Sequence, residues 1–96
     1  MRKENKQSLG DAIKRMISDL GMEDKILAIQ VEELFTEMMG TPIMKYVEQT
    51  KVSKQILYVK MDSPALKNEL QYGKSKIIAH INGEIGKNYL NDVKFI

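Results

Sequence analysis

The stretch Ile56-Leu57-Tyr58-Val59-Lys60-Met61, followed by Asp62-Ser63-Pro64, decides how this chain folds. The first part includes β-branched and aromatic side chains and alternates in character with a period of two, which predicts a strand. Ser63 can cap the free N–H groups of a helix, and Pro64 suits the first helical position because it has no N–H of its own. The stretch therefore predicts a strand that passes directly into a helix.

The helix that begins at Pro64 is expected to run to about residue 85, with Gly86 and Asn88 as stop residues. Gly73 lies in its interior, where glycine costs about 1 kcal/mol relative to alanine, and indicates either a kink or a break into two helices. Residues 92–96 are expected to form a short last strand. A helix that connects two strands of a sheet must lie on one face of that sheet. The apolar stripe of this helix comprises Leu66, Leu70, Ile77, Ile78, Ile81 and Ile85.

Two amphipathic helices are expected upstream. Ser8 and Asp11 resemble a capping box at the start of the first helix, and Gly21 ends it. Glu23 and Asp24 lie in the first turn of the second, where the helix dipole favours acids. The first apolar stripe comprises Leu9, Ala12, Ile13, Met16, Ile17 and Leu20. The second comprises Leu27, Val31, Leu34, Phe35 and Met38, and Ile26 and Ile29 are expected to widen it.

A hairpin is expected between these helices and the stretch at 56–61. Residues 45–52 contain β-forming side chains, and a tight turn follows at 52–56, although the sequence leaves the hairpin register open. The element order is then α-α-β-β-α-β. This order predicts an α+β fold in which helices pack on one face of a three-stranded sheet. Residues 8–96 are expected to form a single domain, preceded by a flexible basic N-terminus at 1–7.

The composition argues against an enzyme. Cysteine is absent from the 96 residues, so the chain has no disulfide, thiol nucleophile or cysteine metal site. His80 is the only histidine, and with Glu84 it lacks any nucleophile or ligand set. We therefore expect no catalytic residues, metal, cofactor or small-molecule substrate. No apolar run approaches the ~20 residues of a membrane span, and no signal peptide is evident, so we expect a cytoplasmic protein without a membrane partner.

Charge is distributed unevenly along the chain, although the net charge is only +2. Residues 1–18 have a balance of +3, residues 19–37 a balance of −5 and residues 38–96 a balance of +4. The second helix is therefore acidic, between a basic start and a basic strand–helix–strand body. Its acids Glu32, Glu33 and Glu37 are expected to serve a protein partner, whereas the basic body suits a polyanion.

The long helix carries the first candidate surface for nucleic acid. Lys67 and Lys74 are seven residues apart and would share a helix face, with Lys76 close by. Gly73-Lys74-Ser75-Lys76 is basic and has the position of the G-x-x-G loop with which KH domains clamp a nucleic-acid backbone, but it lacks the second glycine. These three lysines are candidates for phosphate contacts.

The sheet offers the second candidate surface. If Leu57, Val59 and Met61 face the helices, then Tyr58 and Lys60 face the opposite way. Lys94 lies between Val93 and Phe95 on the last strand and is expected on the same outer face. An aromatic ring among lysines can stack on a base while the ammonium groups hold phosphates. The alternative is an ordinary solvated sheet face.

The motifs along the chain, in their order and spacing, resemble those of the DciA-like family of bacterial replicative-helicase accessory proteins. The likeness runs from about Ser8 to Ile96. Its upstream motifs are Leu9-Gly10-Asp11, Leu20-Gly21-Met22-Glu23-Asp24-Lys25 and Val31-Glu32-Glu33-Leu34-Phe35 ending at Gly40. Its downstream motifs are Leu57-Tyr58-Val59, Ser63-Pro64-Ala65-Leu66, Glu69-Leu70, Ile77-Ile78, Ile81-Asn82, Gly86 and Val93-Lys94-Phe95.

The resemblance implies a KH-like fold, sequence-independent binding of single-stranded or duplex DNA, contact with a DnaB-type replicative helicase, and no enzymatic activity. The family usually has tryptophan where this chain has Phe35 and Leu66, which we expect to be buried. The long basic extension of many members is not found in these 96 residues, so we expect weaker DNA binding. The function expected is recruitment or loading of the helicase in DNA replication. The alternative is a protein-interaction domain that does not bind nucleic acid.

Overall fold

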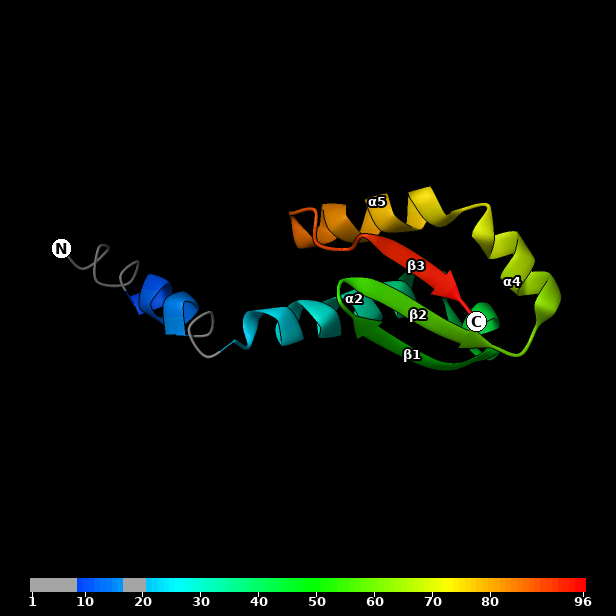
Figure 1. Ribbon diagram of the computed structural model, residues 1–96, viewed down its shortest axis with the longest axis horizontal. Helices are drawn as coiled ribbons and strands as arrows, with labels where there is room; N and C mark the ends of the chain where they lie inside the picture. The colour runs from blue at the N-terminus through cyan, green and yellow to red at the C-terminus, as the bar shows by residue number, and fades with distance from the viewer. Residues whose placement is uncertain (1–8, 17–20) are drawn as a thin grey trace.

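The computed structural model describes residues 9–16 and 21–96 and shows an α+β fold (Figure 1). Residues 9–16 are helical. The expected flexible segment 1–7, the Ser8 cap and the end of the first helix at 17–20 lie outside the described residues. The remaining elements are α2 (Glu23–Met39), α3 (Thr41–Met44), β1 (Val47–Ser53), β2 (Ile56–Met61), α4 (Pro64–Gln71), α5 (Lys74–Ile85) and β3 (Asp92–Phe95).

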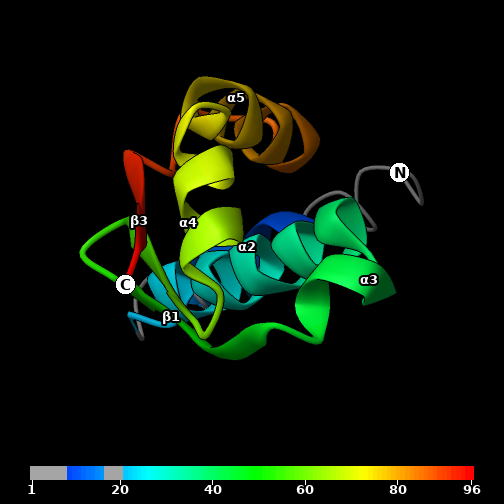
Figure 2. The same cartoon turned by 90° about the vertical axis from the view of Figure 1, so that its right-hand side faces the viewer.

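The sheet has the strand order β1-β2-β3, so residues 56–61 form its central strand. β1 pairs antiparallel with β2, and β2 pairs parallel with β3. The described helices lie on one side of the sheet, and none of them covers its other face (Figure 2). The predicted α+β class, with helices on one face of three strands, is confirmed.

The core lies between the inner face of the sheet and α2 and α5. Leu57 and Val59 of β2 are fully buried, as are Val31 and Phe35 of α2, which confirms the expectation for Phe35. Leu66, expected to be equally buried, is only partly buried and packs at the margin of the core. The difference follows from its position on the short helix α4, none of whose residues is fully buried.

The helix expected from 64 to about 85 is two helices. Ser63 caps α4 as predicted, because its Oγ accepts a hydrogen bond from the Leu66 backbone N–H at 3.2 Å and Pro64 occupies the first turn. α4 ends at Gln71, and α5 starts after Gly73. The φ of Gly73 is −104°, so the break does not require a left-handed residue. Of the two alternatives for Gly73, the structure shows the break.

The hairpin register depends on a two-residue turn. Lys54 and Gln55 have φ angles of 52° and 64°, both in the left-handed region. Such a turn matches the right-handed twist of the flanking strands but is usually built from asparagine and glycine. It fixes the pairing of Ser53 with Ile56 and of Lys51 with Tyr58. A register shift follows between Val47 and Gln49, at the far end of β1.

β3 is held in place by side chains from other elements. The Asn82 amide donates to the Leu90 carbonyl at 2.9 Å and accepts from the Leu90 N–H at 2.8 Å. The Gln55 side chain donates to the Tyr89 carbonyl at 3.1 Å, and the Gln55 carbonyl accepts from the Asn91 N–H at 2.8 Å. Gly86, with a φ of 91°, ends α5 as predicted. These contacts set the register of β3 and thereby the place of Lys94 on the sheet.

Candidate nucleic-acid and partner surfaces

Lysines flank a tyrosine across the open face of the sheet. Lys51 of β1 pairs with Tyr58 of β2, and Tyr58 pairs with Lys94 of β3, so the three residues form one row perpendicular to the strands. Lys51 and Lys94 are exposed, and Tyr58 is half-buried. Because Leu57 and Val59 are in the core, period-two alternation places Tyr58 on the outer face, as the sequence predicted. We call Lys51, Tyr58 and Lys94 the sheet row.

Lys60 lies one pleat further along the same face. It pairs with Gln49, and its Nζ is 3.8 Å from a carboxylate oxygen of Glu48. This ion pair is well exposed, so it is weak and easily exchanged for another anion. A shallow hollow of about 350 Å³ covers part of this face and is lined by Gln49, Thr50, Lys51, Ser53, Tyr58, Lys60 and Ile96.

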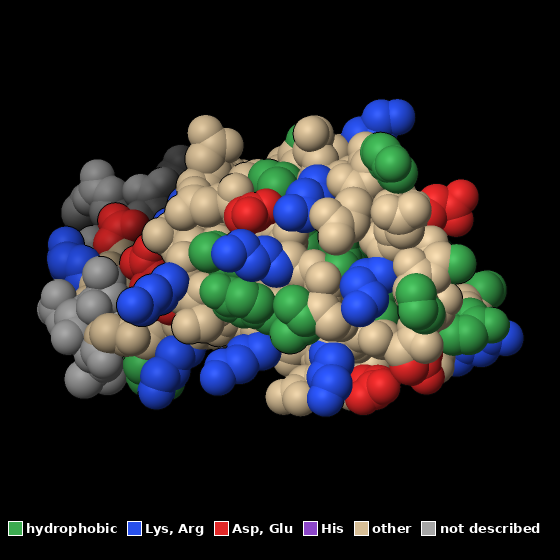
Figure 3. Space-filling model, turned by 45° about the vertical axis from the view of Figure 1, so that its right-hand side comes forward, with side chains coloured by type: hydrophobic (Ala, Val, Ile, Leu, Met, Phe, Trp, Pro, Cys, Tyr) green, Lys and Arg blue, Asp and Glu red, His purple; other side chains and the backbone are tan. Residues whose placement is uncertain are grey.

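Basic side chains are spread over the face that Figure 3 shows, with hydrophobic side chains between them, and acidic side chains lie chiefly towards its borders. A surface of this kind presents ammonium groups and apolar contact area together. That combination suits a strand of nucleic acid, which offers phosphates and base faces at the same time.

The lysines of α4 and α5 do not share a helix face. The prediction that Lys67 and Lys74 lie together assumed one continuous helix and is wrong, because the chain changes direction between α4 and α5. Lys74 is half-buried, and its Nζ is 3.6 Å from a carboxylate oxygen of Asp92. Lys76 is exposed. Between the helices, Tyr72 is 86% exposed, so this junction also carries an aromatic ring beside lysines.

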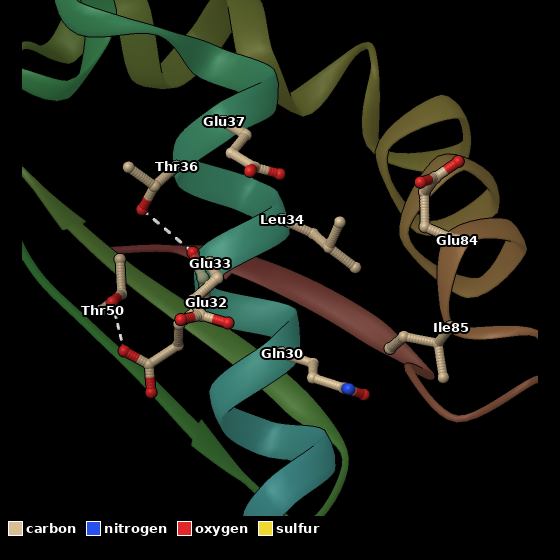
Figure 4. A pocket seen from close by; sticks show the side chains of 9 residues that line it. All are labelled: Gln30, Glu32, Glu33, Leu34, Thr36, Glu37, Thr50, Glu84 and Ile85. Carbon is tan, nitrogen blue, oxygen red and sulfur yellow. Dashed lines mark hydrogen bonds between the residues drawn. The ribbon is translucent and has the colours of Figure 1, made fainter.

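Three acidic side chains of α2 line a groove between α2 and α5, namely Glu32, Glu33 and Glu37. The Glu32 carboxylate is turned towards Thr50 of β1, and Glu84 of α5 contributes a fourth carboxylate from the opposite side (Figure 4). The groove has a volume of about 670 Å³. We call it the acidic groove; its other lining residues are Gln30, Leu34, Thr36, Thr50 and Ile85.

One carboxylate of the acidic groove has a hydrogen-bond partner, and the other three belong to exposed residues. A Glu32 carboxylate oxygen accepts a hydrogen bond from the Thr50 hydroxyl at 2.7 Å, which ties α2 to β1. Glu33, Glu37 and Glu84 are exposed. Leu34 and Ile85 add apolar contact area between the carboxylates (Figure 4). The groove therefore combines negative charge with an apolar strip.

Tyr89 lies against the first turn of α2, and its pKa is raised there. It is 4% exposed, and its hydroxyl donates to an Asp24 carboxylate oxygen at 2.9 Å. Burial, reinforced by the hydrogen bond and the negative charge of Asp24, raises the pKa of Tyr89 to about 12. Beside it, Lys87 forms an ion pair with Glu23 at 3.0 Å. Both contacts are structural, because they fasten the segment before β3 to the first turn of α2.

Three residues of these surfaces were missed by sequence reasoning. Lys51 could not be placed because the sequence left the hairpin register open. Tyr72 was expected in the interior of one long helix. Glu84 was considered only for its spacing to His80. His80 is exposed. Over residues 9–16 and 21–96, no group of three or more potential ligands is placed to hold a metal ion.

The fold and its surfaces define a small α+β protein with a basic, aromatic sheet face and an acidic groove on the helical side. Over residues 8–95 the chain matches the family model described as Dna[CI] antecedent, DciA, and it belongs to this family. The family consists of accessory proteins associated with the loading of the DnaB helicase, rather than of enzymes, which supports an accessory role in replication. No curated protein and no solved structure matches the chain. Among the described helices, none has the length and apolar character needed to cross a bilayer.

Proposed function

We propose that this chain binds DNA through the sheet row and a DnaB-type replicative helicase through the acidic groove, so that it brings the helicase to DNA. The observation that carries the proposal is the register that places Lys51, Tyr58 and Lys94 in one row on the open face. The two surfaces have opposite charge, and they lie on opposite sides of the sheet. One protein can therefore hold a polyanion and a protein partner without competition between them.

The sheet row suits single-stranded DNA in particular. The Tyr58 ring provides a stacking surface for a base, and lysines on both neighbouring strands can reach the phosphates on either side. Such contacts fix the position of the backbone but do not distinguish sequences. Lys67 and Lys76 add positive charge at the α4–α5 junction, whereas Lys74 is partly neutralised by Asp92.

The acidic groove suits a basic amphipathic segment of the helicase. Such a segment would place lysines or arginines against Glu33, Glu37 and Glu84 and apolar side chains against Leu34 and Ile85. Charge complementarity of this kind mainly raises the association rate, and the apolar contacts slow dissociation. The family relation supports a DnaB-type helicase as the partner, and the negative charge and apolar strip of the groove support this groove as its binding place.

DNA binding is tested by fluorescence anisotropy with labelled single-stranded and duplex DNA at two salt concentrations. Changing Lys51 and Lys94 to Gln removes up to two phosphate contacts. The slope of log K against log salt should then become shallower by about 1.4 on single strands, at ~0.7 per contact. The same measurement on Lys67→Gln/Lys74→Gln/Lys76→Gln decides whether the α4–α5 junction contributes. If only this second variant changes the slope, DNA binds at the junction and not at the sheet row.

Helicase binding is tested by capture of a purified DnaB-type helicase on the immobilised chain. Glu32→Gln/Glu33→Gln/Glu37→Gln should weaken capture while leaving DNA affinity unchanged, since glutamine at 32 can still accept the Thr50 hydrogen bond. The two lysine variants should do the reverse. Equal capture by wild type and the glutamate variant would remove the acidic groove as the helicase site.

A second candidate is a protein-interaction domain without DNA binding. The observation that favours it is that two of the candidate DNA-binding lysines already form ion pairs within the chain. Lys60 pairs with Glu48, and Lys74 pairs with Asp92, so their charge is partly neutralised. In that case the wild-type chain shows no salt-dependent change in DNA anisotropy and still captures the helicase.

A further inference from the structure

The hollow of about 350 Å³ on the outer face of the sheet is lined by neutral polar side chains as well as by Tyr58 and two lysines. We call it the sheet hollow. Pockets for small molecules range from about 300 to 1,000 Å³, so its size suits one flat group better than a large ligand. Phosphate contacts and stacking account for the lysines and the ring, but they assign no function to the neutral polar side chains.

Two of these polar side chains flank Tyr58 from the neighbouring strand. Lys51 of β1 pairs directly with Tyr58, so Gln49 and Ser53, two residues before and after Lys51, are the diagonal neighbours of Tyr58 on the same face. Diagonal neighbours in an antiparallel pair lie about 7–8 Å apart, within reach of aromatic and long side chains. A flat group stacked on the Tyr58 ring would therefore have the Gln49 amide and the Ser53 hydroxyl at its edges.

The polar groups of the sheet hollow differ in the hydrogen bonds that they already form. The Thr50 hydroxyl donates to a Glu32 carboxylate oxygen at 2.7 Å and is thereby turned towards the helical side. Within residues 9–16 and 21–96, no hydrogen bond engages the side chain of Gln49 or Ser53. Gln49 is exposed, and its amide offers one acceptor and two donors. It can therefore donate to and accept from the same ligand.

Charge and shape together define the ligand. Lys51 is exposed, and its ammonium forms no ion pair with the other described residues, whereas Lys60 has Glu48 beside it. Ile96 adds apolar contact area to the lining. A nucleotide of a single strand combines a phosphate, a flat face and a polar edge, and all three are accessible because its base is unpaired. A base within a duplex hides both of its faces.

We propose that the sheet hollow receives one base of a bound single strand and that Gln49 distinguishes this base by hydrogen bonds to its edge. The inference rests on the proposed binding of DNA at the sheet row and adds base selection to it. Lys51 positions the backbone, and Gln49 reads the base. Glutamine is suited to adenine, with which it forms a bidentate pair through N6 and N7. Adenine is therefore favoured over the pyrimidines at this position.

Fluorescence anisotropy with labelled oligo(dA), oligo(dC) and oligo(dT) of equal length tests the role of Gln49. Gln49→Leu should raise the Kd for oligo(dA) about fivefold and change the Kd for oligo(dT) by less than about twofold. Each strand is compared between two proteins, so the self-stacking of oligo(dA) cancels. The salt slope should stay unchanged, because Gln49 carries no charge. Gln71→Leu is the matched control, since Gln71 is an exposed glutamine at the end of α4 that does not line the sheet hollow.

The outcomes separate this inference from the proposed function. An equal change on all three strands, or no change on any, overturns base selection by Gln49, whereas a salt slope that still depends on Lys51 and Lys94 keeps DNA binding at the sheet row. A wild-type chain that binds none of the strands overturns both.

Entry of a base into the sheet hollow has its own test, because the chain contains no tryptophan. Tyr58→Trp supplies a single fluorescent ring in the sheet hollow. Its emission should be quenched by oligo(dA) and not by a strand of abasic sites, which offers the same phosphates without a base to stack. Tyr46→Trp is the control, since Tyr46 is exposed (41%) but does not line the sheet hollow. Equal emission of Tyr58→Trp with both strands would show that no base enters.

Discussion

The side chain of Asn82 satisfies both backbone polar groups of Leu90. It donates to the carbonyl at 2.9 Å and accepts from the N–H at 2.8 Å, as a neighbouring strand would do. Leu90 is 2% exposed, so these groups have little access to water. Asn82 thus connects α5 to the segment that leads into β3.

We expect Asn82→Ala to lower the free energy of unfolding by about 2–3 kcal/mol, because it leaves a buried donor and a buried acceptor without partners. Urea denaturation followed by circular dichroism measures the change. Asn88→Ala is the matched control, since Asn88 is exposed in the same connection. Equal denaturation midpoints for the two variants would show that water replaces the Asn82 contacts.

The hairpin turn offers a stabilising change. Lys54 has a φ of 52°, a conformation that costs a β-carbon-bearing residue roughly 1 kcal/mol but is tolerated by asparagine. Lys54→Asn should therefore raise the free energy of unfolding by about 0.5–1 kcal/mol. Lys45→Asn, at a position with a φ of −66°, should bring no such gain. A lower thermal midpoint for Lys54→Asn would contradict this account of the turn.

Tyr58 should contribute to single-stranded DNA binding through stacking. Tyr58→Leu keeps apolar bulk on the sheet but removes the aromatic face, and it should cost about 1–2 kcal/mol of affinity, which corresponds to roughly a 5–30-fold rise in Kd. Duplex DNA, whose bases are already stacked, should be affected less. Tyr46→Leu is the control. If the two variants bind single strands equally well, the sheet row acts only through its lysines.

Stability should fall at high pH because of Tyr89. Its pKa is raised to about 12 in the folded chain from 10.0 in the unfolded chain, so only the unfolded state loses the proton between these values. The contribution is constant below pH 10 and decreases by on the order of 2 kcal/mol as pH rises towards 12. Denaturation midpoints of wild type and Tyr89→Phe, compared at pH 9 and pH 11, isolate it. A constant difference between them would exclude this titration.

The central strand and its following helix were predictable, because their signals are local. Alternation from Ile56 to Met61, the Ser63 cap and Pro64 each act within a few residues. Local signals did not decide between a kink and a break at Gly73. The apolar positions Leu70 and Ile77 are seven residues apart, a spacing that fits one continuous helix as well as two separate helices.

The candidate site was only partly predictable, because it depends on pairing between distant residues. Alternation correctly placed Tyr58 and Lys94 on one face. The contribution of Lys51 depends on two residues of the turn, Lys54 and Gln55, whose composition gives no sign of a left-handed conformation. The acidic groove likewise depends on α5 placing Glu84 opposite α2, which helical periodicity alone does not specify.

The strand order also determines the order in which the two strand pairs form during folding. β1 meets β2 through a two-residue turn, so the hairpin can form within microseconds. Ile56 meets Asp92 only after the whole α4–α5 connection has closed, and that closure costs entropy before any parallel pairing is gained. We expect this closure to limit the folding rate, with Leu57 and Val59 open to water until β3 docks. Chaperone binding or aggregation during refolding would therefore begin at the inner face of β2.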